Sequence, residues 1–130
     1  MIGYITVGTN DLQRAMAFYD ALFASVGIRR LLELPQLAAW GVNWNRSMFG
    51  VARPIDGEPA SAGNGTMIAL RQRTREKVRL LHAKALELGG ADEGPPGVRG
   101  ADGSQAFYAA YVRDLDGNKL CFYRVGPADD

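Results

Sequence analysis

The order of the predicted secondary structure occurs twice in this chain, and this repetition is the feature that most limits its possible folds. Each half begins with a short β-prone run, continues into an amphipathic helix and ends in further β-prone runs. The first strand is expected at 2–7, and the helix that follows it is capped by Asn10 and ends near Val26. The second half starts with a strand at 66–71 and a helix at 74–88. The repeated βαβββ order predicts an α+β fold made of two modules.

Length and composition indicate one globular domain. The chain has 130 residues, of which 47% are hydrophobic and 22% charged, which is typical of a single domain at 1–130. Its modules are expected at about 1–54 and 66–126, joined by the Gly-, Pro- and Ser-rich segment 54–65. A net charge of +1 gives no reason to expect a nucleic-acid partner. No stretch resembles a transmembrane span or a signal peptide, so we expect a cytoplasmic protein with no membrane partner.

The end of the chain carries the strongest local pattern, a β-hairpin. Two β-prone runs, 107–113 and 119–125, flank the turn DLDGN. Asp114, Asp116 and Asn118 have the spacing of a turn in which the side chains bond the local backbone. A calcium loop would need further ligands, so we interpret these three residues as structural.

The turn Arg113–Asn118, RDLDGN, resembles the RDPDGN turn near the end of glyoxalase/bleomycin-resistance/extradiol-dioxygenase proteins, the vicinal oxygen chelate superfamily. Three further segments are similar to that family in the same order, and the resemblance covers nearly the whole chain: YITVGTNDLQRAMAFYDALF, GTMIALRQRTREKVRLLHAKALELGG and GADEGPPGVRG. The resemblance implies a curved eight-stranded sheet that two βαβββ modules wrap around a cavity, with the helices on the outer face. It also implies a homodimer, in which modules pair across a two-fold axis.

The resemblance implies a position for a divalent metal, but this chain differs there from the metal-dependent members. Those members take ligands from the first, fourth, fifth and eighth strands, and the matching positions here are Tyr4, the stretch 48–51, Met67 and Cys121. A phenol, a thioether and a thiol do not make a site for Mg, Mn, Fe(II), Ni or Zn. We therefore expect no metal and no other cofactor. His82, the one histidine, lies in the second helix and is expected to be structural.

Strand alternation places a set of side chains on the face away from the helices, which is the concave face in this family. Trp40 and Trp44 are four residues apart in a strand-like run and are expected to share this face. Arg71 and Arg99 could add recognition of an anion. An alternative, in which the aromatic residues only fill the core of the sheet, stays open. The expected lining of the ligand cavity is Tyr4, Trp40, Trp44, Phe49, Met67, Arg71, Cys121 and Tyr123.

Cys121 has two interpretations. It is either a small buried residue that replaces the metal-binding acid, or a reactive thiol in the cavity. A reactive thiol needs a depressed pKa and a nearby cation or base, and Arg71 is the candidate cation. No histidine is placed to act as its base.

Two classes of function follow, and neither identifies a catalytic residue. The first is metal-independent binding of a small aromatic or amphipathic molecule, comparable to the antibiotic-sequestering members of the family, in a cavity at a subunit interface. The second is a diverged lyase, isomerase or dioxygenase acting on a small oxygenated substrate through Tyr4, Arg71 and Cys121. A third alternative is a protein that has a role in assembly or regulation and binds no ligand. The sequence favours ligand binding over catalysis, because it offers few of the side chains that a catalytic reaction would need.

Overall fold

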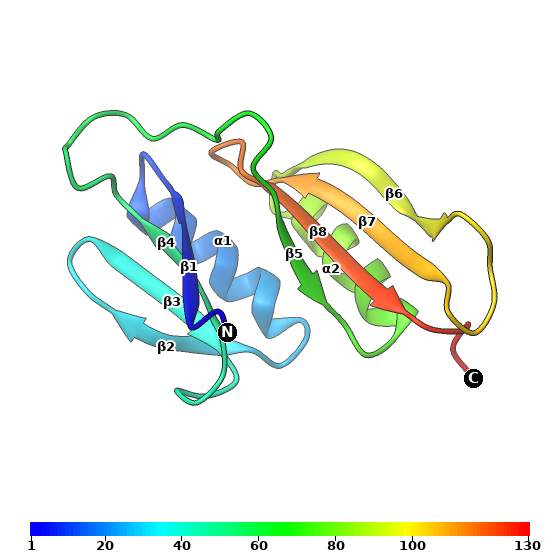
Figure 1. Ribbon diagram of the computed structural model, residues 1–130. Coiled ribbons are helices and arrows are strands. Elements are labelled where there is room, and N and C mark those ends of the chain that lie inside the picture. The colour runs from blue at the N-terminus through cyan, green and yellow to red at the C-terminus, as the bar shows by residue number, and fades with distance from the viewer.

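The computed structural model describes all 130 residues as two four-stranded sheets, each with one helix packed on it (Figure 1). Sheet A has the strand order β1-β4-β3-β2 and contains β1 (Tyr4–Gly8), β4 (Met48–Ala52), β3 (Leu37–Gly41) and β2 (Arg29–Glu33). Sheet B has the order β5-β8-β7-β6 and contains β5 (Ile68–Arg71), β8 (Lys119–Val125), β7 (Phe107–Arg113) and β6 (Ala91–Arg99). The helices are α1 (Leu12–Ala24) and α2 (Arg75–Glu87).

The two sheets have the same topology, which confirms the predicted α+β fold of two βαβββ modules. In each sheet the first strand of the module pairs in parallel with its last strand, β1 with β4 and β5 with β8, and the other pairs are antiparallel. The eight strands form two separate sheets, since β1 and β5 do not pair with each other.

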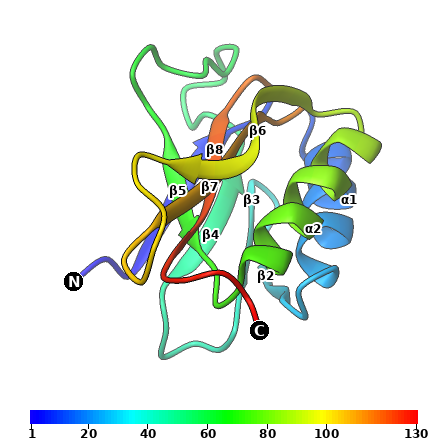
Figure 2. The same cartoon turned by 90° about the vertical axis from the view of Figure 1, so that its right-hand side faces the viewer.

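Both helices lie on the same side of the molecule and contact each other, as Figure 2 shows. The core lies between the helices and the sheets, and its completely buried side chains include Leu22, Val51, Leu81, Leu120 and Phe122. Burial of one such side chain contributes about 1.5–3 kcal/mol to folding. Neither helix has the length and apolar character needed to cross a membrane.

One strand, β6, was not recognised individually in the sequence. It contains Pro95 and Pro96, which cannot donate to a β-ladder. The structure accommodates them because β6 is an edge strand with two shifts of register, between Asp92 and Gly94 and between Gly94 and Gly97. Proline is tolerated at such edges and bulges.

The caps of the two helices were predicted with different success. Thr74 caps α2 as expected, because its hydroxyl accepts from the backbone N–H of Lys77 at 3.1 Å. The prediction for α1 was wrong by one residue, since the carboxylate of Asp11 accepts from Arg14 N at 3.1 Å. Asn10 instead accepts from the backbone N–H of Ala60 at 2.7 Å and holds the segment between the sheets.

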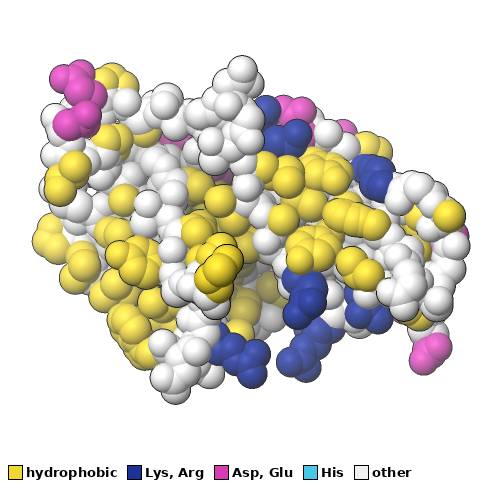
Figure 3. Space-filling model, viewed as in Figure 1, with side chains coloured by type: hydrophobic (Ala, Val, Ile, Leu, Met, Phe, Trp, Pro, Cys, Tyr) yellow, Lys and Arg dark blue, Asp and Glu magenta, His cyan; other side chains and the backbone are white.

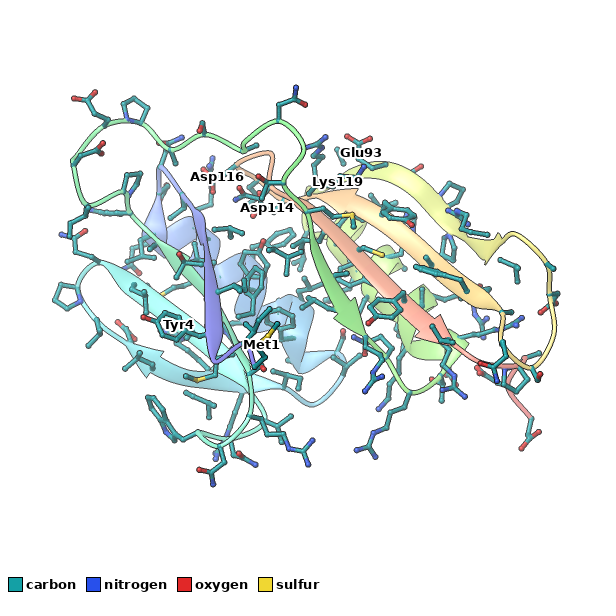
Figure 4. The ribbon with its side chains drawn as sticks, viewed as in Figure 1. Met1, Tyr4, Glu93, Asp114, Asp116 and Lys119 are labelled. Carbon is teal, nitrogen blue, oxygen red and sulfur yellow. The ribbon has the colours of Figure 1, made fainter.

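The hairpin turn at 114–118 is structural, as predicted, and it also joins the two sheets. Within the turn, Asp114 Oδ1 accepts from the backbone N–H groups of Asp116 at 2.9 Å and Asn118 at 2.8 Å. Across the sheets, Asp116 Oδ2 accepts from Thr9 Oγ1 at 2.6 Å, and Asn118 Nδ2 donates to Gly8 O at 2.8 Å. Figure 4 shows Asp114 and Asp116 in the region between sheet A and sheet B.

Tyr19 on α1 completes this junction by donating its hydroxyl hydrogen bond to Asp114 Oδ2. Burial, with a further contribution from the Asp114 carboxylate, raises the pKa of Tyr19 well above its ordinary value. The phenol is therefore held as a donor, and the turn fixes the position of sheet B relative to α1.

Candidate functional site

The face of sheet B turned away from α2, which we call the open face of sheet B, gathers the candidate ligand-binding residues. Leu120 and Phe122 on β8 belong to the core. Because side chains alternate along a strand, Lys119, Cys121 and Tyr123 lie on the open face. Figure 3 looks onto this face and shows hydrophobic side chains over β7 and β8, bordered by lysine and arginine.

Strand β7 adds two aromatic rings to the open face. Phe107 stacks on Tyr123 with ring centroids 5.4 Å apart and an interplanar angle of 8°. Tyr111 lies directly opposite Cys121 in the antiparallel pair. All three rings are partly exposed, so this face offers aromatic surface that nothing in the chain covers.

Strand β5 contributes to the open face from the other side of β8. Ile68 and Leu70 pack against the core, and the alternation therefore sends Ala69 and Arg71 to the open face. Arg71 is the register partner of Tyr123, and Met67 precedes the strand on the same side.

Two cations lie close to the Tyr111 ring. The guanidinium carbon of Arg99 and the Nζ atom of Lys119 are each 5.5 Å from its centroid. Neither cation forms a salt bridge. Arg99 comes from β6 and Lys119 from β8, which are the two neighbours of β7 in the sheet.

The environment of Cys121 favours the unreactive interpretation. The residue is buried, and burial raises the pKa of the thiol, although a hydrogen bond with Tyr111 and the charges of Arg99 and Lys119 act in the opposite direction. A reactive cysteine requires a depressed pKa. The cations that affect the thiol are Arg99 and Lys119 rather than the expected Arg71.

Two residues expected in the cavity lie on sheet A, on the side away from α1. Tyr4 is 65% exposed on β1, and Trp44 is 60% exposed in the loop between β3 and β4. Together with Met48 they line a hollow at the N-terminal end of β1. In Figure 4, Tyr4 lies on sheet A, whereas Lys119 lies on sheet B.

The placement of Trp40 and Phe49 in the cavity was wrong. These side chains are 1% and 5% exposed and pack against Tyr19 and Phe23 of α1, on the opposite face of sheet A. Trp40 and Trp44 do not share a face, because β3 ends at 41 and the chain turns before Trp44.

The eight expected cavity residues therefore fall into three places, and only four of them lie together on the open face of sheet B: Met67, Arg71, Cys121 and Tyr123. Sequence reasoning missed Phe107, Tyr111 and Lys119. The signal for Tyr111 was present, since the hairpin turn fixes the strand register and so places Tyr111 opposite Cys121.

The residues at the expected metal position do not suit a divalent metal. Tyr4 pairs with Met48 in sheet A, while Cys121 lies beside Ala69 in sheet B. No group of three or more His, Cys, Asp or Glu side chains is arranged so that it could hold a metal ion. His82 is on α2, where its Nε2 atom is 2.9 Å from Asp92 Oδ1. The chain thus lacks the converging carboxylate and imidazole groups that such ions need.

Comparisons with known proteins agree on one family. The family model described as Glyoxalase/Bleomycin resistance protein/Dioxygenase superfamily matches residues 1–122. Among solved structures, a glyoxalase/bleomycin resistance protein from Albidiferax ferrireducens is 34% identical with a TM-score of 0.84, over 95% of this chain and 98% of that one. A search of curated proteins gave no match.

More distant structures share the fold. A hypothetical protein from S. aureus is 24% identical with a TM-score of 0.70, over 95% of this chain and 92% of that one. Lactoylglutathione lyase from Agrobacterium tumefaciens is 19% identical with a TM-score of 0.65, over the same shares of 95% and 92%. At this identity the likeness concerns the arrangement of the strands and helices and not the chemistry.

Proposed function

Because the chain belongs to the glyoxalase/bleomycin resistance protein/dioxygenase superfamily, we propose that it binds a small aromatic or amphipathic molecule on the open face of sheet B without a metal ion. The observation that carries this proposal is the stacked pair of Phe107 and Tyr123, which is partly exposed beside Tyr111. Such rings offer flat apolar surface, and the two tyrosines add a polar hydroxyl, which suits a planar ligand.

The small residues between these rings let the larger side chains of the open face lie close together. Ala109 and Cys121 are on this face but are completely buried. A ligand would therefore contact the exposed parts of the surrounding rings, and the apolar area buried there would favour binding.

We include a homodimer in the proposal, in which sheet A of a second copy covers the open face of sheet B. Several large apolar side chains near the open side of sheet A are exposed, including Tyr4, Val42 and Trp44. Contiguous exposed apolar surface of this kind marks interaction sites. A two-fold arrangement would cover both copies in the same way and is the usual symmetry of small oligomers. Cytoplasmic residence stays a prediction.

A diverged lyase, isomerase or dioxygenase has less support. Within one chain the residues suggested for it are divided, since Tyr4 is on sheet A whereas Arg71 and Cys121 are on sheet B, so they could meet only across the proposed dimer. The raised pKa of Cys121 keeps its thiol protonated at neutral pH. Ligand binding requires neither that Tyr4, Arg71 and Cys121 come together nor that the thiol be an activated nucleophile.

The test is a melting-temperature screen with aromatic and amphipathic compounds, followed by mass spectrometry of each stabilising compound. We expect stabilising ligands that are recovered unchanged from untagged protein. Metal content is measured in parallel after incubation with Mn, Fe(II), Ni and Zn and removal of excess ion. Stoichiometric metal, or conversion of a stabilising compound, would contradict the proposal.

A further inference from the structure

We propose that the ligand of the open face of sheet B is an aromatic organic anion, such as an aryl carboxylate, whose charged group is bound by Arg99 and Lys119 beside Tyr111. This inference rests on the function proposed above and specifies the chemical class of its ligand.

Arg99 is held in place by the backbone of its own strand. Its Nη1 atom donates to Gly97 O at 2.9 Å, and its Nη2 atom donates to Pro95 O at 2.8 Å. These bonds use the irregular part of β6, where the register shifts. A guanidinium has five N–H groups, so further donors stay available to a ligand. A cation that is already positioned loses less conformational entropy on binding.

Two glycines make room for the Arg99 side chain. A Cβ atom at Gly94 would come within 3.0 Å of the Tyr111 ring and 3.2 Å of Arg99 Nη2. A Cβ atom at Gly97 would lie 3.2 Å from Arg99 Nη1. The absence of side chains at these positions lets the guanidinium approach both the strand and the ring of Tyr111.

The acidic side chains at this end of sheet B already have partners. Glu93 Oε1 accepts from Arg113 Nε at 2.7 Å, and this hydrogen bond is the main reason that the pKa of Glu93 is lowered. Asp92 is bonded to His82 on the helix side. Figure 4 shows Glu93 and Lys119 at the same end of the sheet, yet no salt bridge joins them. The charge of Lys119 also helps to lower the pKa of Glu93, but because Lys119 forms no salt bridge, its N–H groups stay available to a ligand.

The aromatic stack lies within the reach of a small ligand from these cations. Tyr123 is two residues beyond Cys121, the partner of Tyr111, so the two tyrosines are diagonal neighbours on one face. Diagonal positions in an antiparallel pair are roughly 7–8 Å apart. An aromatic ring on the Phe107–Tyr123 stack would thus place an attached carboxylate beside Tyr111, where charge-assisted hydrogen bonds are strong.

The test compares two fluorescent probes that differ by one charged group, anilinonaphthalene sulfonate and phenylnaphthylamine. We expect the sulfonate to bind at least about tenfold more tightly than the neutral probe, as one charge-assisted contact would provide. The variants Arg99→Gln and Lys119→Gln should each reduce this preference while binding of the neutral probe persists. Arg29→Gln serves as a matched control, because Arg29 is an exposed cation on β2 of the other sheet. Circular dichroism and melting curves confirm that each variant is folded.

The outcomes separate this inference from the proposed function. If neither probe binds, the proposed binding face itself is wrong. If both probes bind with equal affinity, or if Arg99→Gln and Lys119→Gln keep the full preference, the face binds aromatic molecules but the anion site is wrong. Loss of the preference in Arg71→Gln alone would also overturn the assignment, since Arg71 is the other exposed cation beside Tyr123.

Discussion

The open faces of the two sheets share one topology but differ in their side chains. On sheet A the central strands present no aromatic ring on this face, and the residues there are Leu37, Ala39, Gly41, Met48, Gly50 and Ala52. The equivalent strands of sheet B carry Phe107, Tyr111 and Tyr123 between small residues, with cations beside them. The helix-facing sides are alike, because both are packed into one core.

This difference shows that the repeated module fixes the fold without fixing the function. The central strands of sheet A carry no aromatic stack on their open face, and exposed apolar side chains such as Tyr4 and Trp44 lie beside them, which suits contact with another surface. A surface of stacked rings and unpaired cations suits a ligand with both flat apolar and charged parts. We infer that the second module binds the ligand and that the first module of a second copy covers the binding face.

Breaking the junction between the sheets should have the largest effect. Asp114 is buried and accepts from Tyr19, Asp116 and Asn118. Asp114→Ala leaves several buried donors without partners, so we expect the free energy of unfolding to fall by about 3 kcal/mol. Urea denaturation measures this loss. Asp56→Ala is the comparison, because Asp56 is exposed and makes one local hydrogen bond. Equal, small losses in both variants would show that the turn does not join the sheets.

The covering role proposed for sheet A is tested by Tyr4→Asp. A carboxylate at this exposed position would be buried without a partner in the proposed dimer, and we expect the dimer dissociation constant to rise about hundredfold. Sedimentation velocity over a range of concentrations measures the change. Ile55→Asp provides the matched variant, since Ile55 is fully exposed in the connecting segment. A wild-type protein that stays monomeric at all concentrations would rule out the proposed coverage.

The binding role proposed for sheet B is tested by Tyr123→Ala. Removal of the ring destroys the stack with Phe107, and we expect both fluorescent probes to bind about tenfold more weakly. Leu80→Ala should leave binding unchanged, because Leu80 is exposed on α2, on the other side of the sheet. Fluorescence titration measures both variants. Unchanged binding in Tyr123→Ala would place the probes elsewhere on the molecule.

The comparison of the two sheets also explains which parts of the structure were predictable from sequence. The repeated order, the helix faces and the hairpin turn depend on local periodicity, and the structure confirmed them. Strand β6 was not predicted from the sequence, because Pro95 and Pro96 are unusual in a strand. They are tolerated here because β6 is an edge strand.

The candidate site was less predictable, because a strand does not reveal which of its faces is buried. The strands that contain Trp40 and Phe49 are short and apolar on both sides, so contact with α1 decides their direction. Arg99 lies over the ring of Tyr111 because β6 has shifts of register. Such shifts cannot be predicted from the alternation of side chains along a strand. The location of Tyr111 opposite Cys121 was available from the hairpin register alone.

The smallest predicted effect concerns the thiol beneath the aromatic rings of sheet B. Burial raises the pKa of Cys121, so the folded state holds the thiol proton more tightly than the unfolded state does. This contribution to stability is fully present below the ordinary thiol pKa and is lost as the pH rises through the raised value. We therefore expect the unfolding free energy of the wild type to fall more steeply than that of Cys121→Ala above about pH 8.5.

Urea denaturation across this pH range measures the difference, and subtraction of the variant removes the contributions of other titrating groups. Alkylation by iodoacetamide gives an independent readout, because only the thiolate reacts. We expect Cys121 to be alkylated much more slowly than free cysteine at neutral pH. Rapid alkylation would mean that Arg99 and Lys119 outweigh burial, and would support a catalytic thiol on the same face that we assign to binding.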